Sequence, residues 1–234
     1  MKKYFSLAVV VLTMNIAAFA QQNKIEGSWS HADGDLKTIV LIMDGYITTS
    51  HFKTNEFLWT KGGIATIDNQ LIKIKTEFNS ADSEKTGNAL AIKYTLNGDE
   101  LELIEDGKTS RYTRIANASG ALDGIWKISG REQDGKLVTI HQTGARKTLK
   151  MLTGTRFQWF AINPETKQFS GTGGGTYTFA DGKYTENIDF FSRDNSRVGA
   201  SLSFDGKLEE GKWHHSGLSS KGDKIYEVWE RVKY

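Results

Sequence analysis

The chain repeats itself, and this repetition constrains its fold more than any other feature. Residues 62–87 align with residues 174–199 without a gap, so that Phe78 falls on Phe190. Shorter matches lie in the same order around this segment: Gly27-Ser-Trp29 with Gly124-Ile-Trp126, Lys37-Thr-Ile39 with Lys147-Thr-Leu149, and Tyr112-Thr-Arg114 with Trp229-Glu-Arg231. Four matches in one order predict two copies of one domain.

Both copies have the pattern of antiparallel β-structure. Turn pairs such as Asn97-Gly98 and Asp181-Gly182 separate short segments rich in β-branched and aromatic residues, as in β-hairpins. Closing such a meander into a barrel removes its exposed edges. The sequence therefore predicts an all-β protein with two tandem antiparallel up-and-down barrels. The expected division is a signal peptide at 1–20, an N-terminal barrel at 21–115, a linker at 116–121 and a C-terminal barrel at 122–234. The N-terminal copy is the shorter one, which leaves an abbreviated barrel open.

The N-terminus has the pattern of a secretory signal peptide. Lys2 and Lys3 precede an apolar run, which ends in the small-x-small sequence Ala18-Phe-Ala20. We therefore expect cleavage after Ala20 and a periplasmic or secreted protein. No membrane span is expected, because no stop-transfer segment follows. The chain has no cysteine, which excludes disulfides and a lipidated cysteine.

Composition narrows the possible partners. Without Lys2 and Lys3 the chain has 28 basic and 28 acidic residues, so net charge gives it no reason to bind nucleic acid or an anionic membrane. Its five histidines include no His-x-His or His-x-x-x-His spacing, which argues against a metal site. No motif calls for a cofactor. The expected partner is a small-molecule ligand, and a protein partner at the cell surface stays open.

The motifs at the two ends of each copy resemble a known family. A Gly-x-Trp on the first strand with an Arg on the last strand is similar to the signature of the lipocalin and fatty-acid-binding-protein superfamily, the calycins. Residues from about 122 to 234 also resemble secreted bacterial lipocalin-like domains. The resemblance implies that the Arg packs across the Trp and closes one end of the barrel, Arg114 on Trp29 and Arg231 on Trp126. It implies a cavity but not a ligand.

Two inward positions distinguish the copies. Ile72 and Ile74 alternate with lysines, so they face the interior of a barrel. The alignment places Tyr184 and Glu186 at these positions in the second copy. A buried carboxylate is costly unless it is hydrogen-bonded, ion-paired or protonated. Glu186 therefore pairs with an internal base such as Arg231 or Arg156, contacts a ligand, or lies outside through an error in register.

Neighbouring strands supply the other candidates. In the segment "TRFQWFAI" we expect Phe157 and Trp159 to face inward, because the opposite choice buries Arg156 together with Gln158. The run Gly173-Gly-Gly175 indicates a bulge or close backbone approach rather than a phosphate loop. Since Trp213 and His215 share a face of their strand, His215 is the expected cavity residue. The candidate ligand-binding set is Tyr184, Glu186, Trp159, Phe157, Tyr177 and His215.

These residues favour a binding protein that holds a small amphipathic or polar ligand in the C-terminal barrel. The N-terminal barrel would be a scaffold, because its equivalent strand is aliphatic. The alternative is an isomerase, lyase or hydrolase that uses Glu186 as general acid or base, assisted by Tyr184 or His215. A structural or adaptor role at the cell surface is a third hypothesis, and it predicts a C-terminal barrel packed solid.

Overall fold

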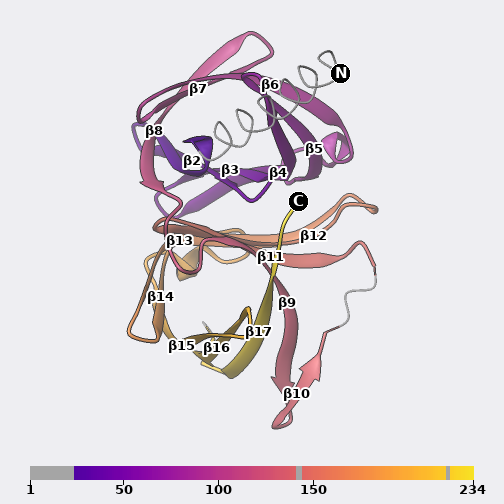
Figure 1. Ribbon diagram of the computed structural model, residues 1–234, viewed down its shortest axis with the longest axis vertical. Helices are drawn as coiled ribbons and strands as arrows, with labels where there is room; N and C mark the ends of the chain where they lie inside the picture. Colours follow the sequence, from indigo (N-terminus) through magenta and orange to yellow (C-terminus); the bar gives the residue numbers. More distant parts are fainter. Residues whose placement is uncertain (1–23, 141–143, 220–221) are drawn as a thin grey trace, which may run out of the picture.

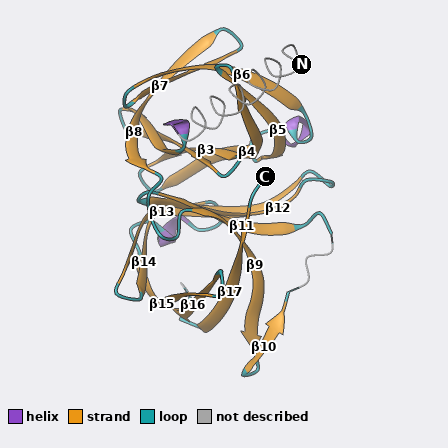
Figure 2. Ribbon diagram, in the orientation of Figure 1, coloured by secondary structure: helices purple, strands orange, loops and turns teal. Residues whose placement is uncertain are grey.

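The protein consists of two antiparallel β-barrels in tandem (Figure 1). The computed structural model describes residues 24–140, 144–219 and 222–234, so the expected signal peptide lies outside the described residues. Strands dominate the described chain, and two short 3₁₀ helices lie between them (Figure 2). No helix in these ranges is long and apolar enough to cross a membrane. The prediction of two tandem all-β barrels is confirmed.

The N-terminal barrel is a closed meander in which each strand pairs with the next and β1 pairs with β8. It has a full set of eight strands and is not abbreviated. The strands are β1 (Gly27–Asp33), β2 (Leu36–Met43), β3 (Tyr46–Lys53), β4 (Glu56–Asp68), β5 (Leu71–Asn79), β6 (Ala89–Asn97), β7 (Glu100–Glu105) and β8 (Lys108–Asn117), with the 3₁₀ helix η1 (Ser83–Lys85) after β5.

The C-terminal barrel has the same order and closes through pairing of β9 with β17. One further strand, β10, pairs with β9 in a hairpin that projects beyond the barrel (Figure 1). The elements are β9 (Gly124–Gln133), β10 (Lys136–Thr139), β11 (Lys147–Thr153), β12 (Arg156–Asn163), β13 (Gln168–Ala180), β14 (Lys183–Phe191), η2 (Asn195–Arg197), β15 (Ser201–Glu209), β16 (Lys212–Leu218) and β17 (Lys224–Val232). The connection from β8 to β9 is short, and β8 includes the first two residues of the expected linker.

Equivalent residues of the two barrels make the same local bonds. The Ser80 hydroxyl accepts a hydrogen bond from the backbone N–H of Thr60 at 2.8 Å, and Ser192 accepts one from Thr172 at the same distance. Asp82 and Asp194 cap η1 and η2 in the same manner. The duplication visible in the sequence is therefore a duplication of hydrogen-bonding geometry.

The glycines of the repeat lie at bulges where two backbones approach closely. The ladder shifts register at Gly62/Gly63 and again at Gly174/Gly175. A Cβ on Gly175 would lie 1.8 Å from the carbonyl oxygen of Asn187, and one on Gly63 would lie 2.0 Å from that of Lys75. No side chain fits at these two positions, which accounts for Gly63 and for Gly175 at the end of the glycine run.

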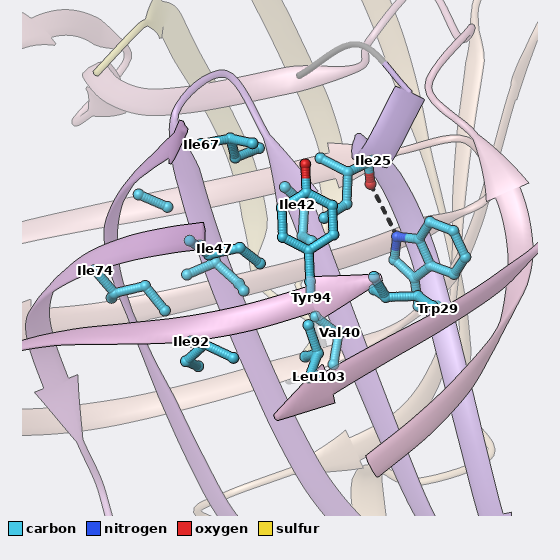
Figure 3. Close-up of a cluster of buried hydrophobic side chains, with 13 residues drawn as sticks. Ile25, Trp29, Val40, Ile42, Ile47, Ile67, Ile74, Ile92, Tyr94 and Leu103 are labelled. Atoms are coloured by element: carbon cyan, nitrogen blue, oxygen red, sulfur yellow. Dashed lines mark hydrogen bonds between the residues drawn. The ribbon is translucent and has the colours of Figure 1, made fainter. Parts of the chain in front are cut away.

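Aliphatic side chains fill much of the N-terminal barrel (Figure 3). Ile72 and Ile74 are buried while Lys73 and Lys75 are exposed, as the alternation predicts. At one end of this core the Trp29 indole donates a hydrogen bond to the carbonyl oxygen of Ile25 at 3.0 Å (Figure 3).

The outer faces of the two barrels pack against each other and form a second core. Phe52, Phe78 and Tyr46 come from the N-terminal barrel, and Phe160 and Phe190 come from the C-terminal one. The ring centroids of Phe78 and Phe160 are 4.9 Å apart, and those of Phe52 and Phe190 are 4.8 Å apart. The barrels are thus joined by an apolar interface.

Polar contacts cross the same interface. Gln158 donates from Nε2 to Thr60 Oγ1 at 3.0 Å and to its repeat equivalent Thr172 at 3.1 Å. Lys147 Nζ lies 2.8 Å from Glu77 Oε1. Phe157 and Trp159 do face the interior of their barrel, but Gln158 is also buried because the neighbouring barrel covers the opposite face of β12. The predicted orientation of Phe157 and Trp159 is therefore correct. The reason given for it was wrong, because Arg156 and Gln158 are both buried as well.

Candidate functional site

In each barrel an arginine on the last strand lies over a tryptophan on the first strand. The Arg231 guanidinium lies 4.5 Å from the centroid of the Trp126 ring, and that of Arg114 lies 3.9 Å from the Trp29 ring. Arg231 also donates to the carbonyl oxygens of Asp123 and Ala121. These contacts tie β17 to the segment that precedes β9.

A cavity of about 290 Å³ lies inside the C-terminal barrel. Three members of the expected ligand-binding set line it, Trp159, Glu186 and His215. The other lining residues are Thr148, Lys150, Ile188, Phe191, Arg197, Ala200, Leu202, Phe204, Ser219, Ile225, Glu227 and Trp229. The barrel is therefore not packed solid, contrary to what a purely structural role predicts.

Glu186 points inward and belongs to a buried ion pair. Its Oε1 lies 2.8 Å from Lys150 Nζ, and the side chains of both residues are only 7% exposed. The same oxygen accepts a hydrogen bond from the Tyr184 hydroxyl at 2.9 Å. The expected partners were wrong, because Arg156 pairs with Asp189 on β14 and Arg231 covers Trp126. The base is a lysine on β11, directly opposite Trp126 in the β9–β11 ladder.

Four aromatic rings surround the Lys150 ammonium group. Its Nζ lies 5.2 Å from the centroid of the Trp229 ring, 5.3 Å from those of Trp213 and Tyr184, and 5.9 Å from that of Phe157. Aromatic faces attract cations, so these rings partly replace the water that burial removes. Burial and the nearby Glu186 raise the pKa of the Tyr184 phenol well above its usual value, so Tyr184 acts as a donor.

His215 and Glu227 form a second polar pair in the cavity. His215 Nδ1 lies 3.4 Å from Glu227 Oε2, a long contact, and Nε2 has no hydrogen-bond partner within the described residues. Burial lowers the pKa of His215 more than Glu227 raises it, which favours the neutral ring. Burial raises the pKa of Glu227, but contacts with His215 and Trp229 and the charge of Lys150 outweigh this effect. The resulting pKa is below the usual value, so Glu227 is anionic at neutral pH.

The remaining expected residues lie beside the cavity rather than on its wall. Tyr184 and Phe157 are fully buried in the surrounding aromatic core. Tyr177 donates a hydrogen bond to Asp123 Oδ1 at 2.8 Å. Asp123 also accepts from the backbone N–H groups of Gly120 and Gly154. Tyr177 therefore supports the connection between the barrels instead of contacting a ligand.

The residues that sequence reasoning missed are Lys150 and Glu227. Lys150 faces Trp126 where Val40 faces Trp29 in the first barrel. Extending the match of Lys147-Thr-Leu with Lys37-Thr-Ile by one residue reveals this replacement. The strand ladders likewise place Glu227 at the position of Ser110, and His215 at that of Leu103. The sequence of β17, KIYEVWERV, does not alternate cleanly between polar and apolar residues, so it gave no indication that Glu227 faces the interior.

The N-terminal barrel also contains a cavity, of about 280 Å³. Ile47, Ile74, Leu90, Ile92 and Leu103 form much of its wall, and the Lys61–Glu105 ion pair (2.9 Å) lies along it. The aliphatic residues of β5 that suggested a scaffold thus lie beside a cavity, since Ile74 is part of its wall. In the described part of the chain, no three His, Asp or Glu side chains come together in a way that could hold a metal ion in either barrel.

Comparison with known proteins assigns no activity to either barrel. Residues 121–234 match the family described as a domain of unknown function, DUF4488, which covers the C-terminal barrel. An uncharacterized protein of known structure from Bacteroides eggerthii DSM 20697 is similar at 13% identity and a TM-score of 0.33. The similarity covers 47% of this chain and 98% of that protein. None of the curated proteins compared with the sequence matches it.

Proposed function

We propose that the chain is a lipocalin-like binding protein of the periplasm or the extracellular space, and that its C-terminal barrel holds a small amphipathic or polar ligand. The observation that supports this most strongly is the cavity of about 290 Å³, in which Nε2 of the buried His215 has no hydrogen-bond partner among the described residues. Buried polar groups are normally satisfied. A ligand group that bonds to His215 would remove this cost.

The composition of the wall supports the same function. Small-molecule sites combine apolar and aromatic surface with a few fixed polar groups. Trp159, Phe191 and Trp229 provide aromatic surface, while His215 and Glu227 provide the polar groups. The signal-peptide pattern of residues 1–20 supports export, and the Trp–Arg closures support the likeness to lipocalins.

The contacts of Glu186 favour a binding function over a catalytic one. Its Oε1 already accepts hydrogen bonds from Lys150 and Tyr184, and a general acid or base needs a proton-transfer route to the substrate. We therefore assign Glu186 to positioning Lys150 and Tyr184. Replacement of Glu186 by Gln should leave part of the affinity for the ligand, whereas a catalyst would lose turnover while still holding its substrate.

A pair of cavity-filling variants tests the location of the site. Ala200→Trp places a large side chain into the C-terminal cavity, and Thr49→Trp does so in the N-terminal cavity. Binding of small aromatic solutes is measured by saturation-transfer NMR on the intact chain. We expect Ala200→Trp to abolish the signal and Thr49→Trp to preserve it. The opposite pattern would place the binding site in the N-terminal barrel and refute the proposal.

A further inference from the structure

The charged groups around the C-terminal cavity are not equally available to a ligand. Among the described lining residues, Lys150 and Arg197 are cationic and Glu186 and Glu227 are anionic. Arg197 Nε contacts Asp194 Oδ2 at 3.2 Å, so an acid outside the cavity offsets its charge. Lys150 pairs directly with Glu186, and its charge also lowers the pKa of Glu227. Lys150 and Arg197 are thus each held by an acid, whereas Glu227 has no lysine or arginine at ion-pair distance among the described residues.

Glu227 is the carboxylate with capacity for another partner. Its Oε2 accepts a hydrogen bond from the Trp229 indole at 3.1 Å and lies 3.4 Å from His215 Nδ1. An ionised carboxylate offers about four acceptor positions on its two oxygens. The side chain is 26% exposed, which agrees with its place on the cavity wall.

His215 adds a second acceptor beside Glu227. A neutral imidazole carries its proton on one nitrogen and accepts through the other. Because Nδ1 lies 3.4 Å from the Glu227 carboxylate, the proton is best placed on Nδ1, which leaves Nε2 as an acceptor. His215 is only 2% exposed, so water satisfies this nitrogen poorly. The pair therefore requires a ligand group rich in hydrogen-bond donors.

Aromatic side chains line the rest of the same space. Trp159, Phe191, Phe204 and Trp229 all contribute to the wall. Faces of tryptophan and phenylalanine stabilise a cation that has lost its water, and they also bury an apolar body. One chemical class complements the anionic Glu227, the acceptor on His215 and the aromatic walls.

We propose that the C-terminal cavity binds a small organic amine in its protonated form. The ammonium group donates hydrogen bonds to Glu227 and His215, and the apolar body of the amine packs against Trp159. This assignment rests on the proposed binding function and adds the charge and donor character of the ligand.

Three probes that share a phenyl ring and differ in their polar group test the assignment. Isothermal titration calorimetry on the full-length mature chain compares 2-phenylethylamine, 2-phenylethanol and 3-phenylpropionate at neutral pH. We expect the amine to bind at least about tenfold more tightly than the alcohol, because hydrogen bonds to charged groups are the stronger ones. The carboxylate should bind most weakly. Equal or tighter binding of the alcohol or the carboxylate would overturn the amine assignment while leaving the binding function intact. Failure of all three probes would overturn both.

A matched pair of variants identifies the carboxylate. Glu227→Gln removes the charge and keeps an oxygen acceptor for Trp229, so we expect it to lower amine affinity by about tenfold or more. Affinity for 2-phenylethanol should stay nearly the same, which also shows that the variant is folded. Glu230→Gln is the control, because Glu230 lies on the same strand and pairs with Lys212 on the exterior. A Glu227→Gln variant that keeps wild-type amine affinity would overturn the assignment.

Discussion

Removing the two partners of the buried ion pair one at a time should have unequal effects. Lys150→Val and Glu186→Ile install the residues that occupy these positions in the N-terminal barrel, Val40 and Ile74. Lys150→Val leaves Glu186 buried without a cation and also withdraws the charge that acts on Glu227. Removing one partner of a buried pair costs about 3–5 kcal/mol in free energy of unfolding, and we expect Lys150→Val to lie in this range.

Glu186→Ile should cost less. Lys150 keeps the electrostatic attraction of Glu227 and the four surrounding rings, and a desolvated cation–π contact contributes about 2 kcal/mol. We therefore expect a loss of about 1–3 kcal/mol, due mainly to the Tyr184 hydroxyl, which loses its acceptor. The double variant has the same defect and should also lose about 1–3 kcal/mol. Since the single losses add up to about 4–8 kcal/mol, the coupling energy should be about 3 kcal/mol or more.

Equilibrium urea unfolding followed by tryptophan fluorescence measures these losses, since Trp126, Trp213 and Trp229 lie in this core. Asp68→Asn is the control, because the Lys73–Asp68 pair is about half exposed and should contribute about 0–1 kcal/mol. Additive single effects, or a larger loss for Glu186→Ile than for Lys150→Val, would refute this description of the pair.

Three other perturbations test separate parts of the structure. Gly175→Ala should lower the free energy of unfolding by about 2 kcal/mol or more, because its Cβ would collide with the Asn187 carbonyl group; an unchanged urea midpoint would contradict the close approach. Gln158→Ala should lower the free energy of unfolding by about 1–3 kcal/mol, because the buried hydroxyls of Thr60 and Thr172 lose the amide that donates to them; an unchanged free energy of unfolding in chemical denaturation would contradict that contact. Burial lowers the pKa of His215 below its unfolded value of about 6.5, so the unfolded chain binds more protons just below that pH and stability falls as pH decreases through this window. Urea midpoints across that range should show a shallower decline for His215→Leu, with part of the remaining slope due to His51, whose pKa burial also lowers; an identical slope in the variant would contradict the shift.

The repeat made the fold predictable. Its ungapped segment fixed which residues are equivalent, and alternation on β5 fixed which of them face inward. The signals are local, so they carry no information on what covers the outer face of a strand. Phe160 and Gln158 are buried because a second barrel packs against β12, and no period-2 pattern describes a strand buried on both faces. Asp134-Gly135 is a turn pair of the same kind as Asn97-Gly98; such a pair predicts a hairpin, but it does not predict that β10 projects beyond the barrel.

The candidate site was predictable in part for the same reason. Glu186 and Trp159 follow from alternation in the aligned strands, and both line the cavity. The partner of Glu186 depends on which strands meet across the interior, which the spacing of residues along one strand does not specify. Comparison of the copies at one more position, Val40 against Lys150, would have supplied it. Predicting Glu227 as a site residue requires the register of β16 and β17, which places Glu227 opposite His215.

A crystal structure of the mature chain with 2-phenylethylamine bound tests the central claim most directly. The account predicts the amine inside the C-terminal barrel, with its nitrogen within hydrogen-bond distance of Glu227 and its ring against Trp159. Density for the amine only in the N-terminal barrel or on the outer surface, beside an empty C-terminal cavity, would contradict it.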